Sequence, residues 1–119
     1  MSLDSHSRLL LLVPLYPASG NGKTNLRHAR RLENKMFWRL GCRGRLDPFG
    51  LLVDSRNAFL NTGYFGTSIL ATVPRKTVEK IGSAEHLKQT LQKMASSSII
   101  VGDIWLYDES TRTTISLRR

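Results

Sequence analysis

Arginines recur through residues 39–56, and their side-chain chemistry is that of phosphate binding. A guanidinium group donates paired hydrogen bonds to a phosphate, and such contacts position a protein on a polynucleotide without reading its sequence. The stretch passes through the turn residues Asp47-Pro48 and ends on Asp54-Ser55-Arg56. We therefore expect a strand-turn-strand unit that presents four arginines to a polyanion: Arg39, Arg43, Arg45 and Arg56.

A second basic group precedes this stretch and has helical spacing. Apolar residues recur at three- and four-residue intervals from Leu26 to Met36, and basic residues repeat every four positions on another side. Like charges at that spacing destabilise an isolated helix by about 0.2–0.5 kcal/mol per pair, which an anion against the basic side would offset. A solvated helix face is the competing interpretation. The binding candidates are Arg27, Arg30, Arg31 and Lys35.

The tripeptide Gly22-Lys23-Thr24 follows an apolar run and resembles the end of a nucleotide-binding loop. That motif needs a glycine where this chain has Pro17, and proline offers neither the N–H group nor the required backbone freedom. We therefore expect no nucleotide site. Two interpretations stay open: a loop in which Lys23 meets an RNA phosphate, and a plain solvent-exposed loop.

Other reactive residue types give no pattern of catalysis or metal binding. Ser55 has no histidine nearby in the sequence to activate it, and the three histidines are isolated. Cys42 is expected to be a small core residue. Most aromatic residues are expected in the core as well, and Trp38, which lies among arginines, is the candidate for base stacking. We expect no catalytic residue, no metal and no cofactor.

Charge and length narrow the class of partner. The chain has 119 residues and a net charge of +9, of which +7 belongs to residues 1–45. Such a balance favours anionic partners, and a chain of this length is too short for a large enzyme with a deep cleft. The single cysteine excludes an internal disulfide and indicates a reducing compartment. No apolar run reaches the roughly 20 residues that span a bilayer.

The distribution of apolar and turn residues predicts an α+β fold, with a small mixed sheet of three to four strands and one or two packed helices. We expect residues 1–35 to be a basic N-terminal extension and residues 36–119 to form the domain. Whether the extension is ordered without its partner stays open.

Individual elements follow from local patterns. Ser83 is expected to cap a helix that extends to Ala95, and the segment after Gly102-Asp103 either continues a strand or caps a short helix over Ile104–Tyr107. Phe37–Leu40 either continues the preceding helix or opens a strand, and we favour the strand. The other expected strands are Leu9–Val13, Phe49–Val53, Tyr64–Val73 and Ile99–Val101.

Four short motifs in this order resemble the family of bacterial small-subunit ribosomal protein sixteen, which also occurs in mitochondria and plastids. They are Arg39-Leu40, Arg43-Gly44, Pro48-Phe49 and Asp54-Ser55-Arg56, followed by Asn61-Thr62-Gly63 in a turn. The match covers about 30 residues. The chain departs from the family in the spacing of these motifs, and Phe59, Leu60 and Asn61 stand where a second arginine usually precedes the glycine turn.

The resemblance implies a non-enzymatic constituent of the small ribosomal subunit that binds ribosomal RNA and supports subunit assembly and translation. Its implied partners are small-subunit ribosomal RNA and neighbouring ribosomal proteins, with no membrane and no small-molecule substrate. The segment before the match is more typical of a mitochondrial member, in the matrix ribosome, than of a plastid or bacterial cytoplasmic one. The alternative is a free-standing RNA-binding or RNA-processing factor of the same compartment, and a small nucleotide-dependent enzyme is a weaker third hypothesis.

Overall fold

The computed structural model describes residues 8–17, 22–48, 59, 62, 64, 66–115 and 117. Their secondary structure begins with strand β1 (Arg8–Pro17), helix α1 (Gly22–Leu40), and strands β2 (Arg43–Asp47) and β3 (Ser68–Pro74). Two helices follow, α3 (Arg75–Ile81) and α4 (Ala84–Met94), and then three short strands: β4 (Ile99–Val101), β5 (Trp105–Asp108) and β6 (Thr113–Thr114).

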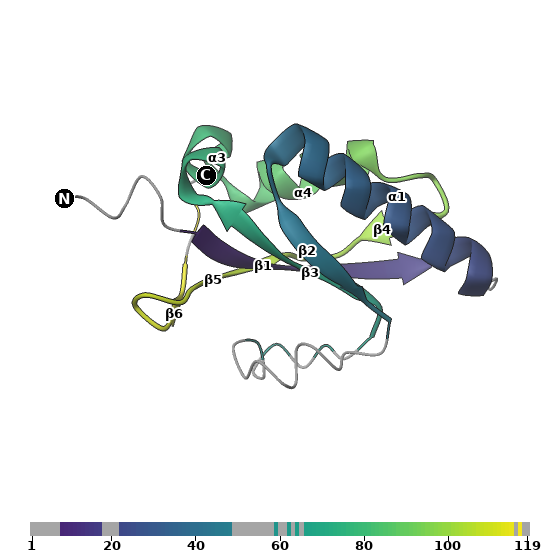
Figure 1. The fold of residues 1–119 in the computed structure, drawn as a ribbon, viewed down its shortest axis with the longest axis horizontal. Helices are drawn as coiled ribbons and strands as arrows, with labels where there is room; N and C mark the ends of the chain where they lie inside the picture. Colours follow the sequence, from purple (N-terminus) through teal and green to yellow (C-terminus); the bar gives the residue numbers. More distant parts are fainter. Residues whose placement is uncertain are drawn as a thin grey trace.

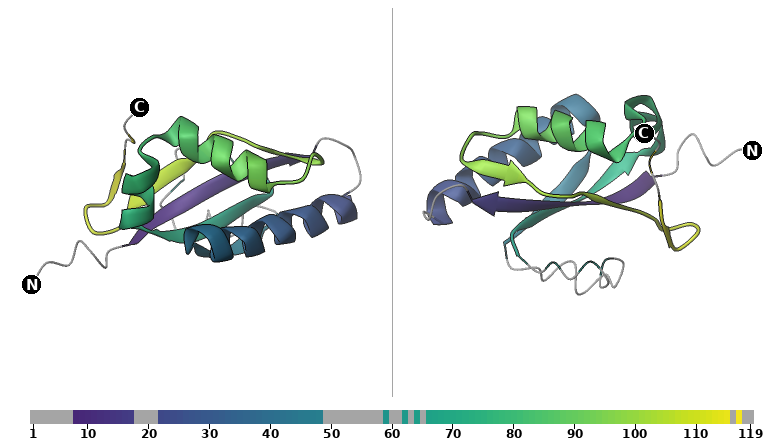
Figure 2. Two further views of the ribbon diagram at one scale, coloured as in Figure 1. Left: turned by 90° about the horizontal axis from the view of Figure 1, so that it is seen from above. Right: turned by 180° about the vertical axis from the view of Figure 1, so that it is seen from behind.

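The strands form one antiparallel sheet in the order β2-β3-β1-β5-β6, and β4 pairs with the far end of β1. The three helices lie on one face of this sheet (Figure 1), and α1 and α4 run side by side in the view from above (Figure 2). Strand β3 lies between β1 and β2, which are consecutive in the chain apart from α1. This is the β-α-β-β-α-β arrangement of ferredoxin-like domains, with its last strand divided into β4 and β5.

Strand β1 is the centre of the molecule because both of its faces are buried. Leu9, Leu11 and Val13 pack under the helices, while Leu10 and Leu12 join a second apolar cluster on the opposite face. A run of consecutive apolar residues, rather than an alternating pattern, is what a strand covered on both sides requires. The remaining core on the helical face comes from α1 (Ala29, Leu32 and Met36) and α4 (Leu87, Leu91 and Met94).

The α+β class is confirmed, and the described residues contain six strands and three helices, more than the numbers expected. The division into an extension over residues 1–35 and a domain over 36–119 differs from the structure. Strand β1 occupies the middle of the sheet, and the boundary falls inside α1. The apolar content of β1 places it in the core, whereas the basic composition of residues 1–45 had suggested a separate arm.

The expected strand over Phe37–Leu40 is wrong, because α1 continues to Leu40. Met36 and Leu40 extend the four-residue spacing of Leu32 toward the core. The helix ends at Leu40, and the next residue, Gly41, has a φ of 66°, the left-handed conformation that glycine adopts most easily. The first basic motif of the family resemblance, Arg39-Leu40, therefore lies in a helix.

Other expectations are confirmed. Ser83 caps α4 by accepting a hydrogen bond from the His86 N–H group at 3.0 Å, and Ile99–Val101 is a strand. The open segment after Gly102-Asp103 is the strand β5. Helix α3 was missed, because Pro74 suggested only the end of a strand and in fact also precedes the first turn of a helix. The expected strand Phe49–Val53 lies outside the described residues.

Candidate nucleic-acid interface

Helix α1 separates its apolar and basic residues on opposite sides. Ala29, Leu32 and Met36 are at most 1% exposed, whereas the cations between them point away from the sheet. The exposed cations of this helix are Arg27, Arg30, Arg31, Lys35 and Arg39. Because the core fixes the rotation of the helix about its axis, the same spacing that buries the apolar residues presents the arginines to solvent.

Strand β2 carries two more arginines at the sheet edge next to α1. It is the last strand at one edge of the sheet, and it pairs only with β3 among the described strands. Arg43 and Arg45 are both exposed on it, and their pairing with Thr72 and Leu70 directs them toward the sheet face opposite the helices. The Arg43 guanidinium nevertheless reaches back to the Phe37 ring of α1. Charged residues on an edge strand oppose pairing with another sheet, and here they continue the basic surface of α1 around the sheet edge. We call the exposed cations of α1 and β2 together the α1–β2 basic surface.

No carboxylate among the described residues pairs with the arginines of this surface. The ion pairs of Arg75 with Asp108 and of Lys88 with Asp103 lie elsewhere, and Glu33 is the only acidic residue of α1. Lys35 differs from the arginines because its ammonium group donates a hydrogen bond to the Met94 carbonyl at 2.9 Å. It therefore ties α1 to α4 as well as contributing charge.

Two aromatic rings lie beside the arginines at the C-terminal end of α1. Trp38 is 81% exposed, and its ring lies 5.4 Å from that of Phe37, centroid to centroid, at 71°. The guanidinium of Arg43 lies over the Phe37 ring at 5.0 Å, within the range of a cation–π contact. Phe37 thus connects α1 to β2, while Trp38 has most of its surface in solvent.

The sheet face opposite the helices is not an open platform. Leu10, Leu12 and Leu70 are at most 6% exposed there, and Phe59 packs among them. The Phe59 ring also meets Tyr107 at 6.0 Å. Domains of this topology that bind RNA on the sheet stack bases on aromatic residues of that face. In this chain the central residues of the face are aliphatic and buried, so among the described residues this face offers no comparable stacking platform.

The structure exposes seven of the nine predicted binding residues on the adjacent elements α1 and β2, namely those of the α1–β2 basic surface. Lys23 lies in the first turn of α1 rather than in a loop, and its side chain is outside the described part of the structure. Arg56 is also outside the described residues, as are Asp54 and Ser55. The spacing of the cations was visible in the sequence. The contact between Arg43 and Phe37 was not, because it depends on how β2 packs beside α1.

Cys42 is buried immediately before β2 and belongs to the core under the helices, as its size suggested. Burial raises the pKa of its thiol to about 12, which keeps it protonated and unreactive at neutral pH.

Within the described residues, no three His, Cys, Asp or Glu side chains lie close enough to hold a metal ion. Among the same residues, no helix is long and apolar enough to cross a membrane.

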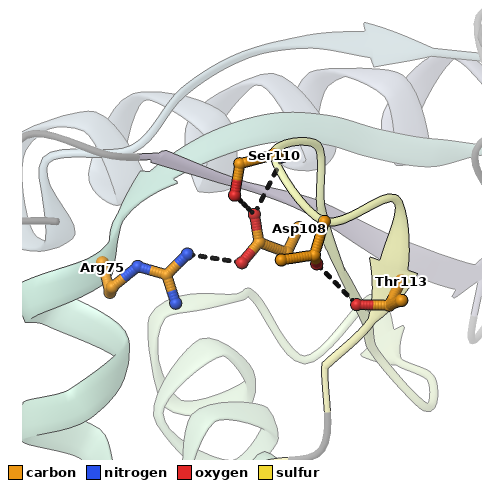
Figure 3. A network of polar contacts seen from close by, with 5 residues as sticks. Arg75, Asp108, Ser110 and Thr113 are labelled. Atoms are coloured by element: carbon orange, nitrogen blue, oxygen red, sulfur yellow. Dashed lines mark hydrogen bonds and ion pairs between the residues drawn. The ribbon is translucent and has the colours of Figure 1, made fainter. Parts of the chain in front are cut away.

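A polar network that the sequence did not indicate joins α3 to the C-terminal hairpin (Figure 3). Arg75 donates to the Asp108 carboxylate at 2.6 Å, and Ser110 donates to the same carboxylate through its hydroxyl at 2.6 Å and its N–H group at 3.0 Å. The partners Arg75 and Asp108 are 33 residues apart, so only the fold reveals them. These bonds are internal, so the Arg75 guanidinium is engaged within the fold.

The chain matches no family model, and no curated protein or solved structure is detectably similar to it.

Proposed function

We propose that this protein is a non-enzymatic RNA-binding protein that docks on the phosphate backbone of folded RNA through the α1–β2 basic surface. One observation carries the proposal: arginines without carboxylate partners among the described residues line the exposed side of a helix and the strand edge next to it. Such a surface is costly to leave against water alone, because like charges repel one another.

A phosphate backbone fits this surface better than a small anion does. The arginines are spread along the exposed side of α1 and onto β2, so they form a track instead of converging on one point. Arg27 and Arg31 are separated by about 6 Å along the helix axis, from the rise of 1.5 Å per residue. Contacts of this kind recognise the shape and charge of A-form RNA, whose base edges are hidden in a deep groove.

The proposal is tested by the salt dependence of RNA affinity. For the intact protein and a structured RNA hairpin, the affinity should fall steeply with salt, with a log–log slope of about 0.7–0.9 per phosphate neutralised. The variant Arg27→Gln/Arg31→Gln should lower that slope by about two. A slope that stays unchanged in this variant would contradict the proposed surface.

The matched control is Lys76→Gln/Lys80→Gln, which removes two exposed charges at the same spacing from α3. If net charge alone drives binding, the two double variants should behave alike. The proposal requires the α1 variant to lose more.

The more specific form of the proposal is a constituent of the small ribosomal subunit, with ribosomal RNA and neighbouring ribosomal proteins as partners, in the mitochondrial matrix. It is supported by the order of the four motifs from Arg39 to Arg56 in the sequence. The fold adds no support here, because the family pattern opens on a strand where this chain has the end of α1. The alternative is a free-standing RNA-binding or RNA-processing factor.

Sedimentation separates these two forms. A ribosomal constituent should travel with the small subunit in a gradient at high salt, because neighbouring proteins and a large RNA contact hold it together. A free-standing factor should dissociate under the same conditions and remain at the top of the gradient.

A further inference from the structure

Trp38 is exposed far beyond the other large apolar side chains of the described residues. Its exposed fraction is 81%, and the next highest is 52%, at Ile100. A tryptophan left in water contributes little to the core and forgoes a large hydrophobic stabilisation. The position of Trp38 is therefore better explained by something that covers it than by the packing of the fold.

The neighbours of Trp38 on the helix are the arginines of the basic surface. Positions 27, 31 and 38 differ by four and seven residues, so they share one side of α1. Trp38 lies about two helical turns, roughly 10 Å, beyond Arg31 along the axis. An anionic chain bound to Arg27 and Arg31 and continuing along the helix would pass directly beside the indole ring.

Phe37 and Arg43 hold the surroundings of Trp38 in place. Phe37 meets the indole at 71°, and its own ring is occupied by the Arg43 guanidinium at 5.0 Å. A guanidinium in a cation–π contact uses its face for the ring and still has N–H groups that can donate to a phosphate. The arrangement leaves the Trp38 ring open for stacking. It also places a guanidinium nearby that can donate hydrogen bonds to a phosphate.

We infer that Trp38 stacks on an unpaired base of the RNA that the α1–β2 basic surface binds. The inference rests on the proposed function and refines it, because bases inside a duplex are already stacked on one another and only an unpaired nucleotide can reach the indole. The preferred target is accordingly a helical RNA segment with a bulged or looped-out base, rather than a continuous duplex. A docking surface for an acidic protein is the rival use of the same residues, since tryptophan and arginine also dominate protein interfaces.

The test compares two RNA hairpins that differ only in a single unpaired adenine. Trp38→Leu should weaken binding of the bulged hairpin about tenfold to a hundredfold, from the usual contribution of one stacked base. It should leave the fully paired hairpin nearly unaffected, with the same salt slope, because no charge is removed. Trp38→Phe should restore part of the loss. Labelled RNA provides the readout for all three proteins.

Fluorescence gives an independent measurement. The chain has two tryptophans, so Trp105→Phe leaves Trp38 as the sole indole emitter, and the bulged hairpin should quench it more than the paired hairpin does. Equal binding of both hairpins by wild type and Trp38→Leu, with the Arg27- and Arg31-dependent slope intact, would overturn this inference and leave the proposed function standing. If the wild-type protein bound neither hairpin, both this inference and the proposed function would be wrong. Quenching by polyglutamate but not by RNA would assign the surface to an acidic protein.

Discussion

Asp108 shows how one carboxylate fastens the C-terminal hairpin to the helical layer. Hydrogen bonds from Ser110 and from Arg75 hold the pKa of this carboxyl below its ordinary value. A group whose pKa is lower in the folded state stabilises that state when it is ionised. The contribution is therefore fully present above the unfolded pKa of about 4 and is lost as the pH falls through the folded value.

This linkage predicts the acid sensitivity of the fold at the scale of one residue. Between pH 6 and about pH 4 the term from Asp108 should change little, and below that its free energy of stabilisation should decline. The Asp108→Asn variant has no carboxyl at this position to protonate, so its free energy of unfolding should fall less steeply over the same acid range. Chemical denaturation at a series of pH values measures both curves, and parallel curves would show that Asp108 does not contribute in this way.

At the scale of the element, Gly44 determines how closely β2 approaches β3 and therefore where the arginines of this edge strand lie. A Cβ atom at this position would lie 2.5 Å from the Ala71 Cα and would also meet the Leu70 carbonyl oxygen. Both are backbone atoms of β3, so a rotamer change cannot relieve the contact. The strand must move instead.

Gly44→Ala should therefore destabilise the protein by about 1–3 kcal/mol, the usual cost of overpacking, and should displace β2. The free energy of unfolding checks the first effect. Hydrogen exchange of the amides that pair β2 with β3 checks the second. Arg45→Ala is the control, since it shortens an exposed side chain on the same strand and should change stability by less than about 0.5 kcal/mol. A fully stable Gly44→Ala protein would contradict the described register.

Local patterns in the sequence predicted the elements that short-range chemistry defines. Ser83 and the apolar spacing after it gave α4, and the apolar run from Leu9 gave β1. The sequence did not reveal that β1 is central, because strand order depends on contacts between residues far apart, such as Leu11 with Ala71 and Leu106. The end of α1 was misjudged because aromatic residues, here Phe37 and Trp38, are enriched in strands.

The candidate site divides in the same way. The basic side of α1 follows from spacing, so Arg27 and Arg31 could be identified directly. The closeness of Arg43 to Phe37 follows from tertiary packing and could not be predicted from spacing. The same is true of Lys35, whose ammonium group donates one of its hydrogen bonds to the Met94 carbonyl.

At the scale of the whole molecule, most of the positive charge belongs to the part of the chain that forms β1, α1 and the start of β2. Residues 1–45 hold +7 of the net charge of +9, and the described part of this segment forms the central strand, a helix that covers it and the start of one edge strand. With the opposite face of the sheet closed around Leu12 and Phe59, the α1–β2 basic surface is the side from which a polyanion would be attracted over distances near the Debye length of about 10 Å.

The most direct test of this account is NMR chemical-shift mapping of the intact protein with a structured RNA hairpin. We expect the largest perturbations at the arginine side chains and amides of α1 from Arg27 to Arg39 and of β2 at Arg43 and Arg45, with little change in α3. Perturbations centred on α3 or on the opposite sheet face around Tyr107, or no perturbation by RNA at all, would contradict it.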